Sequence, residues 1–259
     1  MRNAGFMHKD CSILILCIVA GIFVSSCGLE EIITVQEPTV VHNAPLYSSS
    51  DSLTWYFSFE TSPDSDAIGT DVYYKIYNDS SKLSSERSSI LSVNTSTNST
   101  EAAKRMIDTY GYQPLGSNPS TSNSVYFPEK KRSVVFRLKN YAHADSSSSN
   151  VQDRYKSHAC VGLKSGTEYE FTGYIPFRNG NRKSFDFFDD NDDDKNRTRD
   201  ALPVYGDSDY SCTESDKDKS FDEYFVQIFA VGVALNLETV TASYSLVLDL
   251  GSVPIKKDE

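Results

Sequence analysis

The chain has 259 residues, of which 25 are basic and 36 acidic, giving a formal net charge of −11 at pH 7. This negative balance argues against a nucleic-acid partner and against an electrostatic grip on anionic lipid. Hydrophobic residues make up only 39% of the chain, yet 16 Tyr and 14 Phe are present. A composition that is rich in aromatic and poor in aliphatic residues favours strands over helices.

The amino-terminal residues have the layout of an export signal. Arg2 and Lys9 precede an apolar run over residues 13–24, which small residues and Cys27 follow. This run is too short for a membrane-spanning helix, which needs about 20 apolar residues. A basic start, a short apolar run and a small-residue exit predict a signal peptide over residues 1–26. A signal peptide without lipid and a retained helix are the alternatives.

The sequence Val24-Ser25-Ser26-Cys27 resembles the lipobox of bacterial lipoproteins, which the type II signal peptidase cuts just before the cysteine. The resemblance implies a diacylglyceryl group on Cys27 and an acylated amino terminus, and two or more acyl chains hold a protein firmly on a membrane. It also implies a lipid-anchored, extracytoplasmic protein of the cell envelope. Gly28-Leu29 lacks the Asp that retains some lipoproteins in an inner membrane. This favours the outer membrane or cell surface if the cell has two membranes.

Residues 27–50 are predicted to be the lipidated cysteine and a flexible tether, because Pro38, Pro45 and a serine-rich end interrupt regular structure. A weak strand is expected at 32–35. The first firm strand is expected at 53–60, where Trp55, Phe57 and Phe59 fall on one face. We expect Trp55 to be a core residue rather than a ligand platform.

The second strand is expected at 71–77, where Val72, Tyr74 and Ile76 share one face, and Tyr73, Lys75 and Tyr77 share the other. Residues 78–100 are rich in Ser, Thr and Asn and predict a loop. One short helix is predicted at 100–110 from the spacing of its apolar residues, with Gly111 at its end. Further strands are expected at 133–138, 159–163, 169–177, 224–235 and 244–255, and charged loops at 185–200 and 207–222.

Short strands separated by polar turns predict a mainly β domain over residues 51–259, built as an antiparallel β-sandwich. Its Trp55-x-Phe57-x-Phe59 strand, Tyr-rich strand and closing pair of strands resemble a fibronectin type III or immunoglobulin-like sandwich. Together with its tether, the domain is similar to envelope lipoproteins of spirochaete type. Such sandwiches have about 100 residues, so we assign the excess length to an insertion at about 79–155 that carries the helix. The resemblance implies adhesion or partner binding.

Residues 189–194 form an acidic run in which Asp189, Asn191 and Asp193 have the alternating spacing of oxygen ligands in a Ca²⁺ loop. Asp194 occupies the sixth position, where an EF-hand has Gly, and no helices are predicted on either side. These three residues are therefore candidate ligands of a calcium site of another kind, and a solvated acidic loop is the alternative. Apart from this site, no cofactor is expected.

Cysteine use limits the covalent chemistry of the exported domain. Cys160 and Cys212 are the cysteines that remain after the signal and Cys27 are set aside, and an oxidising compartment allows a disulfide between them. The alternative is that Cys160, between Ala159 and Val161, is a small core residue.

The sequence contains no G-x-S-x-G or H-E-x-x-H motif and no glycine-rich phosphate loop, so we do not expect an enzyme. The favoured interpretation is a lipid-anchored module that binds a protein or glycan ligand at the cell envelope. Tyr56, Tyr73 and Tyr77 are candidate contact residues, with packing beneath the inserted segment as the alternative. A structural component of the envelope without an external ligand is the second hypothesis.

Overall fold

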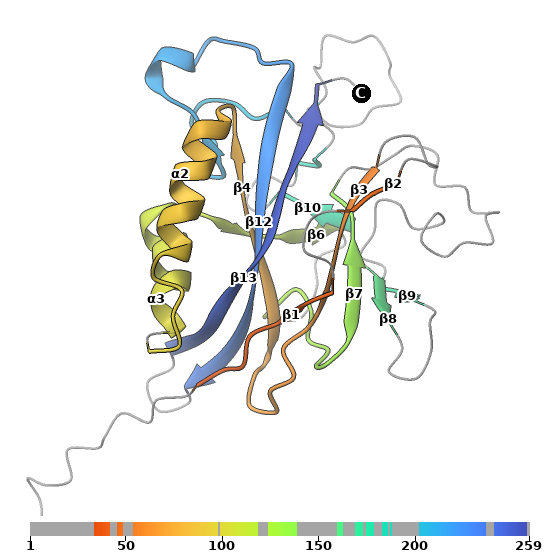
Figure 1. Cartoon of the computed structure of the whole chain (residues 1–259). Coiled ribbons are helices and arrows are strands. Elements are labelled where there is room, and N and C mark those ends of the chain that lie inside the picture. Colours follow the sequence, from red (N-terminus) through yellow and green to blue (C-terminus); the bar gives the residue numbers. More distant parts are fainter. Residues whose placement is uncertain are drawn as a thin grey trace, which may run out of the picture. The chain divides into compact units, whose positions relative to one another are not determined.

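Strands dominate the structure, a computed structural model, and form two larger sheets and one small sheet (Figure 1). The part of the chain that the structure describes belongs to a compact unit, Thr34–Glu259, which is separate from Met1–Ile33. The described residues are 34–41, 46–48, 54–97, 99–118, 124–138, 160–162, 169–172, 175–178, 183–185, 187, 202–236 and 241–257.

The first sheet has the order β1-β3-β7-β8-β9, with β2 also paired to β3, and its pairings are antiparallel. In its centre Phe57 of β3 lies opposite Phe136 of β7, and the two rings stack at 5.0 Å. Its strands are β1 (Thr39–Val40), β2 (Leu46–Ser48), β3 (Thr54–Glu60), β7 (Ser133–Phe136), β8 (Cys160–Gly162) and β9 (Tyr169–Phe171).

The second sheet has the order β11-β4-β12-β13, with β5 also paired to β4. Its long pairings are antiparallel, whereas the short strand β11 pairs with β4 in parallel. Its strands are β4 (Gly69–Tyr77), β5 (Gln113–Pro114), β11 (Tyr210–Ser211), β12 (Glu223–Asn236) and β13 (Thr241–Lys256). A separate antiparallel pair joins β6 (Gly116–Asn118) to β10 (Ile175–Phe177).

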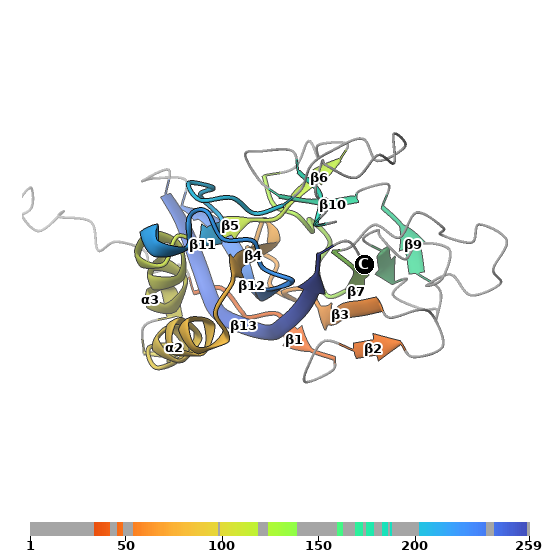
Figure 2. The same cartoon turned by 90° about the horizontal axis from the view of Figure 1, so that it is seen from above.

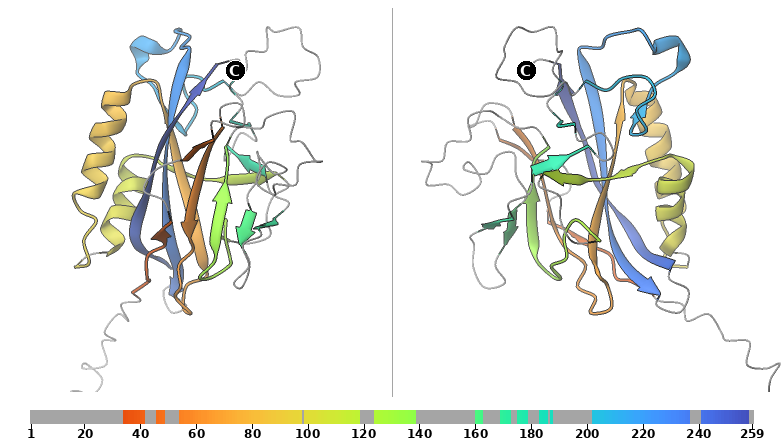
Figure 3. Two further views of the ribbon diagram at one scale, coloured as in Figure 1. Left: turned by 45° about the vertical axis from the view of Figure 1, so that its right-hand side comes forward. Right: turned by 180° about the vertical axis from the view of Figure 1, so that it is seen from behind.

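Strand β4 is buried on both faces, and this determines the layering of the unit. Tyr74 and its neighbours on one face share a hydrophobic cluster with Phe57 and Phe59 of the first sheet. Tyr73 and Tyr77 on the other face pack in a second cluster beneath the helices. Figures 2 and 3 show the helices on one side of the second sheet and the first sheet on the other. The division of the two faces that the sequence predicts for residues 71–77 is confirmed.

The expectation of a loop over residues 78–100 and of a single helix is wrong, because α2 (Ser80–Leu91) forms there. The Asp79 side chain caps this helix by accepting a hydrogen bond from the Ser81 N–H at 2.8 Å. Leu83, Glu86 and Ile90 lie on its buried face. Serine-rich composition hid this helix, since packing of one face, rather than intrinsic propensity, supplies most helical stability in proteins.

The predicted helix at 100–110 is confirmed as α3 (Ser99–Lys104), which continues into a π-helical turn, η1 (Arg105–Thr109). The Tyr110 N–H donates to the Arg105 carbonyl at 3.1 Å, the five-residue spacing of a π turn. Gly111 then ends the helix with a φ of 67°, in the left-handed region that favours glycine.

The carboxyl end of the predicted tether takes part in the first sheet. Strands β1 and β2 fall within residues 27–50, and both pair with β3. Of the weak strand expected at 32–35, the described residues Thr34 and Val35 are not in a strand. Val35 is nevertheless buried, at 4% exposure. Burial of Val35 and pairing to β3 fix this segment on the domain, so the described tether residues do not form a free spacer.

Candidate functional site

A buried ionic network joins strand β10 to the segment that follows residue 202. Arg178 comes directly after β10 and is 1% exposed. Its guanidinium donates to both carboxylate oxygens of Asp209, from Nε at 2.8 Å and from Nη2 at 2.7 Å. Nη2 also donates to Asp207 at 2.6 Å, and the Tyr74 hydroxyl donates to Asp209 at 2.6 Å. The network therefore ties residues 207–209 to the central strand β4.

Burial opposes charge in this network, and close pairing overcomes that penalty. For Asp207, burial works to raise the pKa, but the Val204 N–H and the positive charge of Arg178 outweigh it and hold the pKa below its ordinary value. For Arg178, burial works to lower the pKa, and the two aspartates outweigh it and raise the pKa. The Val204 N–H donates to Asp207 at 3.1 Å. The network thus also positions Val204.

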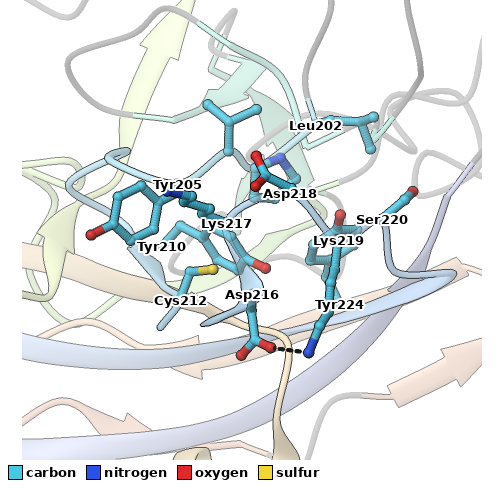
Figure 4. Close-up of a pocket in the computed structure, with 12 residues that line it drawn as sticks. Leu202, Tyr205, Tyr210, Cys212, Asp216, Lys217, Asp218, Lys219, Ser220 and Tyr224 are labelled. Atoms are coloured by element: carbon cyan, nitrogen blue, oxygen red, sulfur yellow. Dashed lines mark hydrogen bonds and ion pairs between the residues drawn. The ribbon is translucent and has the colours of Figure 1, made fainter. Parts of the chain in front are cut away.

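An open pocket of about 250 Å³ lies beside this network (Figure 4). Its wall combines aliphatic and aromatic side chains, and two of these, Val204 and Tyr205, are 47% and 46% exposed. The Tyr205 hydroxyl donates to Glu214 at 2.5 Å, which orients the ring. The apolar and aromatic lining residues are Leu202, Pro203, Val204, Tyr205, Tyr210 and Tyr224.

The polar side of the pocket comes from the charged segment that includes the 3-10 helix η2 (Glu214–Asp216). Lys217 pairs with Glu214 at 3.1 Å, and Lys219 pairs with Asp216 at 2.7 Å. The second of these ion pairs is drawn in Figure 4. Asp218 also lines the pocket and is exposed. Within the described part of the chain, no ion pair involves Asp218.

A second buried polar cluster fastens the helical layer to β4. The Lys75 ammonium donates to Glu86 of α2 at 2.8 Å and to the Tyr110 carbonyl at 2.5 Å. The Tyr77 hydroxyl donates to the same Glu86 oxygen at 2.8 Å. The Lys75 ammonium also lies 5.3 Å from the Tyr77 ring centroid. Burial lowers the pKa of Lys75 despite the hydrogen bond to Glu86. This arrangement is enclosed, and its role is to hold α2 in place.

Asp71, near the start of β4, is a buried carboxylate without a cationic partner in the described part of the chain. Burial raises its pKa to about 6, although backbone N–H groups oppose this by hydrogen bonding to the charged form. The Val72 N–H donates to Asp71 at 3.0 Å and the Tyr126 N–H at 3.3 Å. The Tyr73 hydroxyl likewise works to lower this pKa. Because folding raises this pKa, the stability of the fold depends on pH.

Four residues singled out in the sequence lie outside the described residues. Cys27 and the proposed calcium ligands Asp189, Asn191 and Asp193 all do. No cluster of three metal-ligating side chains occurs among the residues that are described. The lipid anchor and the calcium site therefore stay predictions.

The two candidate disulfide cysteines differ in how far they are described. Cys212 is half-buried and free, and it lines the pocket. For Cys160 only the backbone, in β8, is described. The disulfide between them therefore stays a prediction.

The suggested tyrosine contacts have mixed outcomes. Tyr73 and Tyr77 are 7% and 0% exposed beneath the helices, so the alternative of packing under the inserted segment is confirmed for both. Tyr56 is half-buried, and the Arg137 guanidinium lies over its ring at 5.1 Å. The tyrosines that line the pocket are Tyr205, Tyr210 and Tyr224, of which Tyr205 is exposed, Tyr210 half-buried and Tyr224 buried. No local pattern predicted them as pocket residues, because they lie in and beside the segment 207–222, which was predicted to be a charged loop.

No protein-family model, curated protein or solved structure matches the chain. Among the described helices, none is long and apolar enough to cross a bilayer.

Proposed function

We propose that the chain is an exported lipoprotein, anchored through Cys27, whose β-rich domain is a binding or adhesion module at the cell envelope. The observation that carries the binding role is the open pocket beside Tyr205. The side chains of Val204 and Tyr205 are exposed in its wall, and a hydrogen bond to Glu214 holds the Tyr205 ring in place. Rigid aromatic side chains on loops of a β scaffold supply contact area at low entropic cost. The negative net charge supports a protein or glycan ligand rather than a nucleic acid.

We further infer that the two larger sheets form a sandwich of the fibronectin type III or immunoglobulin-like kind, elaborated by the α2–α3 insertion. The shared cluster of Phe57, Phe59, Tyr74 and Ile76 supports this inference, because inner faces of two sheets bury a common core in such folds. The helices covering the opposite face of the second sheet would be the elaboration, and they lie within the insertion predicted at about 79–155.

Proteolysis of intact cells tests the binding role most directly. A surface module should be cleaved by added protease before the envelope is broken. In a separate pull-down, the intact soluble domain should retain a protein or glycan partner. Complete protection until the envelope is broken would rule out the surface-adhesin form. The structural component of the envelope would then become the favoured function.

The anchor is tested separately by Cys27→Ala in the full chain. Without the thiol there is no acceptor for the diacylglyceryl group, so this variant should stay uncleaved at the lipobox and take up no radioactive fatty acid. Cys17→Ala, a cysteine-to-alanine change within the same signal, should be labelled like the unchanged chain. Labelling that persists in Cys27→Ala would contradict the proposed anchor.

A further inference from the structure

We propose that the pocket beside Tyr205 receives a lysine or arginine side chain of a protein partner, so that the partner presents a basic segment to this domain. This inference rests on the proposed binding function and names the chemistry of its ligand. It depends on the size of the pocket, on its apolar wall and on the balance of its charges.

The size and the wall of the pocket suit a single long side chain. At about 250 Å³, it is smaller than sites for drug-sized molecules, which run from about 300 to 1,000 Å³. Leu202 and Val204 supply an aliphatic surface, and Tyr205 and Tyr210 supply aromatic rings. Lysine and arginine place a methylene stem against such surfaces while the charged head remains near water. The face of a tyrosine ring also attracts a cation.

The charges in the pocket select a cation rather than an anion. Both pocket lysines are already paired, Lys217 with Glu214 and Lys219 with Asp216. Those two ion pairs leave Asp218 as the charge of the described lining without an ionic partner. Coulomb attraction near a protein surface favours a positive group at this carboxylate. An acidic or phosphorylated ligand would meet a charge of its own sign at Asp218, and the net charge of −11 would repel it further.

A neutral glycan would use the aromatic wall but would gain nothing from the charge of Asp218. The dependence of binding on that charge therefore separates the two ligand classes. Fluorescence anisotropy of the full chain in detergent, with a labelled hexa-arginine peptide at physiological salt, measures this dependence. A hexa-citrulline peptide is the matched probe, because citrulline keeps the shape of arginine without its charge.

We expect the unchanged protein to bind hexa-arginine and not hexa-citrulline. Asp218→Asn should weaken binding by about fivefold, which corresponds to about 1 kcal/mol. Asp108→Asn removes the same charge from an exposed position on η1 and should leave the affinity unchanged. Tyr205→Leu should also weaken binding by about fivefold, whereas Tyr205→Phe keeps the ring face and should bind like the unchanged protein.

Equal weakening by Asp218→Asn and Asp108→Asn would overturn the proposal, because binding would then reflect only the net charge. Equal affinity for the two peptides, or no binding of hexa-arginine, would overturn it as well. A chito-oligosaccharide that binds the unchanged protein but not Tyr205→Leu would assign the pocket to a glycan. None of these outcomes affects surface proteolysis, which tests the proposed function independently. Circular dichroism of each variant confirms that these exposed substitutions leave the fold intact.

Discussion

Replacing Arg178 by methionine should lower the free energy of unfolding by about 3–5 kcal/mol, because it leaves buried carboxylates without their cation. Asp209 is 0% exposed and loses two hydrogen bonds from the guanidinium. Asp207 loses the hydrogen bond from Nη2 and keeps Lys183, whose ammonium is 3.6 Å away. Urea unfolding of the purified protein at neutral pH, followed by circular dichroism, measures the loss.

Arg87→Met is the matched control, since Arg87 also pairs with an aspartate, Asp249, but its side chain is 45% exposed. Exposed ion pairs contribute about 0–1 kcal/mol, so this variant should be destabilised far less. Adding Asp209→Asn to Arg178→Met removes one buried charge and should recover part of the loss. Similar losses of unfolding free energy in the two arginine variants would contradict the prediction that unpaired buried carboxylates destabilise the fold more than exposed ones.

Replacing Asp71 by asparagine should stabilise the protein at neutral pH by about 3 kcal/mol. The folded state raises the pKa of Asp71 from 3.8 to about 6, and each pKa unit corresponds to about 1.4 kcal/mol. Above pH 6 the folded protein holds a buried charge that the unfolded chain would expose to water. Asparagine is neutral, and its carbonyl oxygen can still accept from the Val72 and Tyr126 N–H groups.

The sign of the pH dependence follows from proton binding. The folded state binds the Asp71 proton more tightly than the unfolded chain does. The free-energy cost of burying the charged Asp71 therefore disappears as the pH falls from about 6 to about 4. The stability advantage of Asp71→Asn should therefore be full at pH 7 and close to zero near pH 4. Asp108→Asn changes an exposed carboxylate and should show no comparable trend in urea unfolding at each pH. A constant difference between Asp71→Asn and the unchanged protein would contradict the raised pKa.

Strand positions were predictable from the sequence where side chains alternate with a period of two. In residues 71–77 the alternation separates Val72, Tyr74 and Ile76 from Tyr73, Lys75 and Tyr77, and the structure buries the two sets in different clusters. The sequence could not tell that both faces would be covered, because aromatic and charged residues on one face are equally typical of a solvent-facing strand. The cover comes from α2, whose serine-rich sequence carries few apolar residues.

The candidate site was not predictable, and the reason is distance along the chain. Arg178 and Asp209 are 31 residues apart, and Tyr74 and Asp209 are 135 apart. No local spacing of residues in the sequence predicts such pairs. The ion pairs of Lys217 and Lys219 do follow a three-residue spacing, but this pattern is also typical of a solvated turn. The pocket arises only when these segments meet beside β4.

The hydrogen bonds of Arg178 have a consequence for the thermodynamics of ligand capture. Through Asp207 they fix the backbone of Val204, and through Asp209 they fix the residue before Tyr210. A binding surface that is ordered before its ligand arrives loses little conformational entropy on association, so more of the contact energy appears as affinity. Preorganisation of the pocket wall at Val204 and Tyr210 is therefore linked to the stability of the core. Substitutions at Arg178 should weaken association although Arg178 does not contact the ligand, because this part of the wall would then adopt an ensemble of conformations.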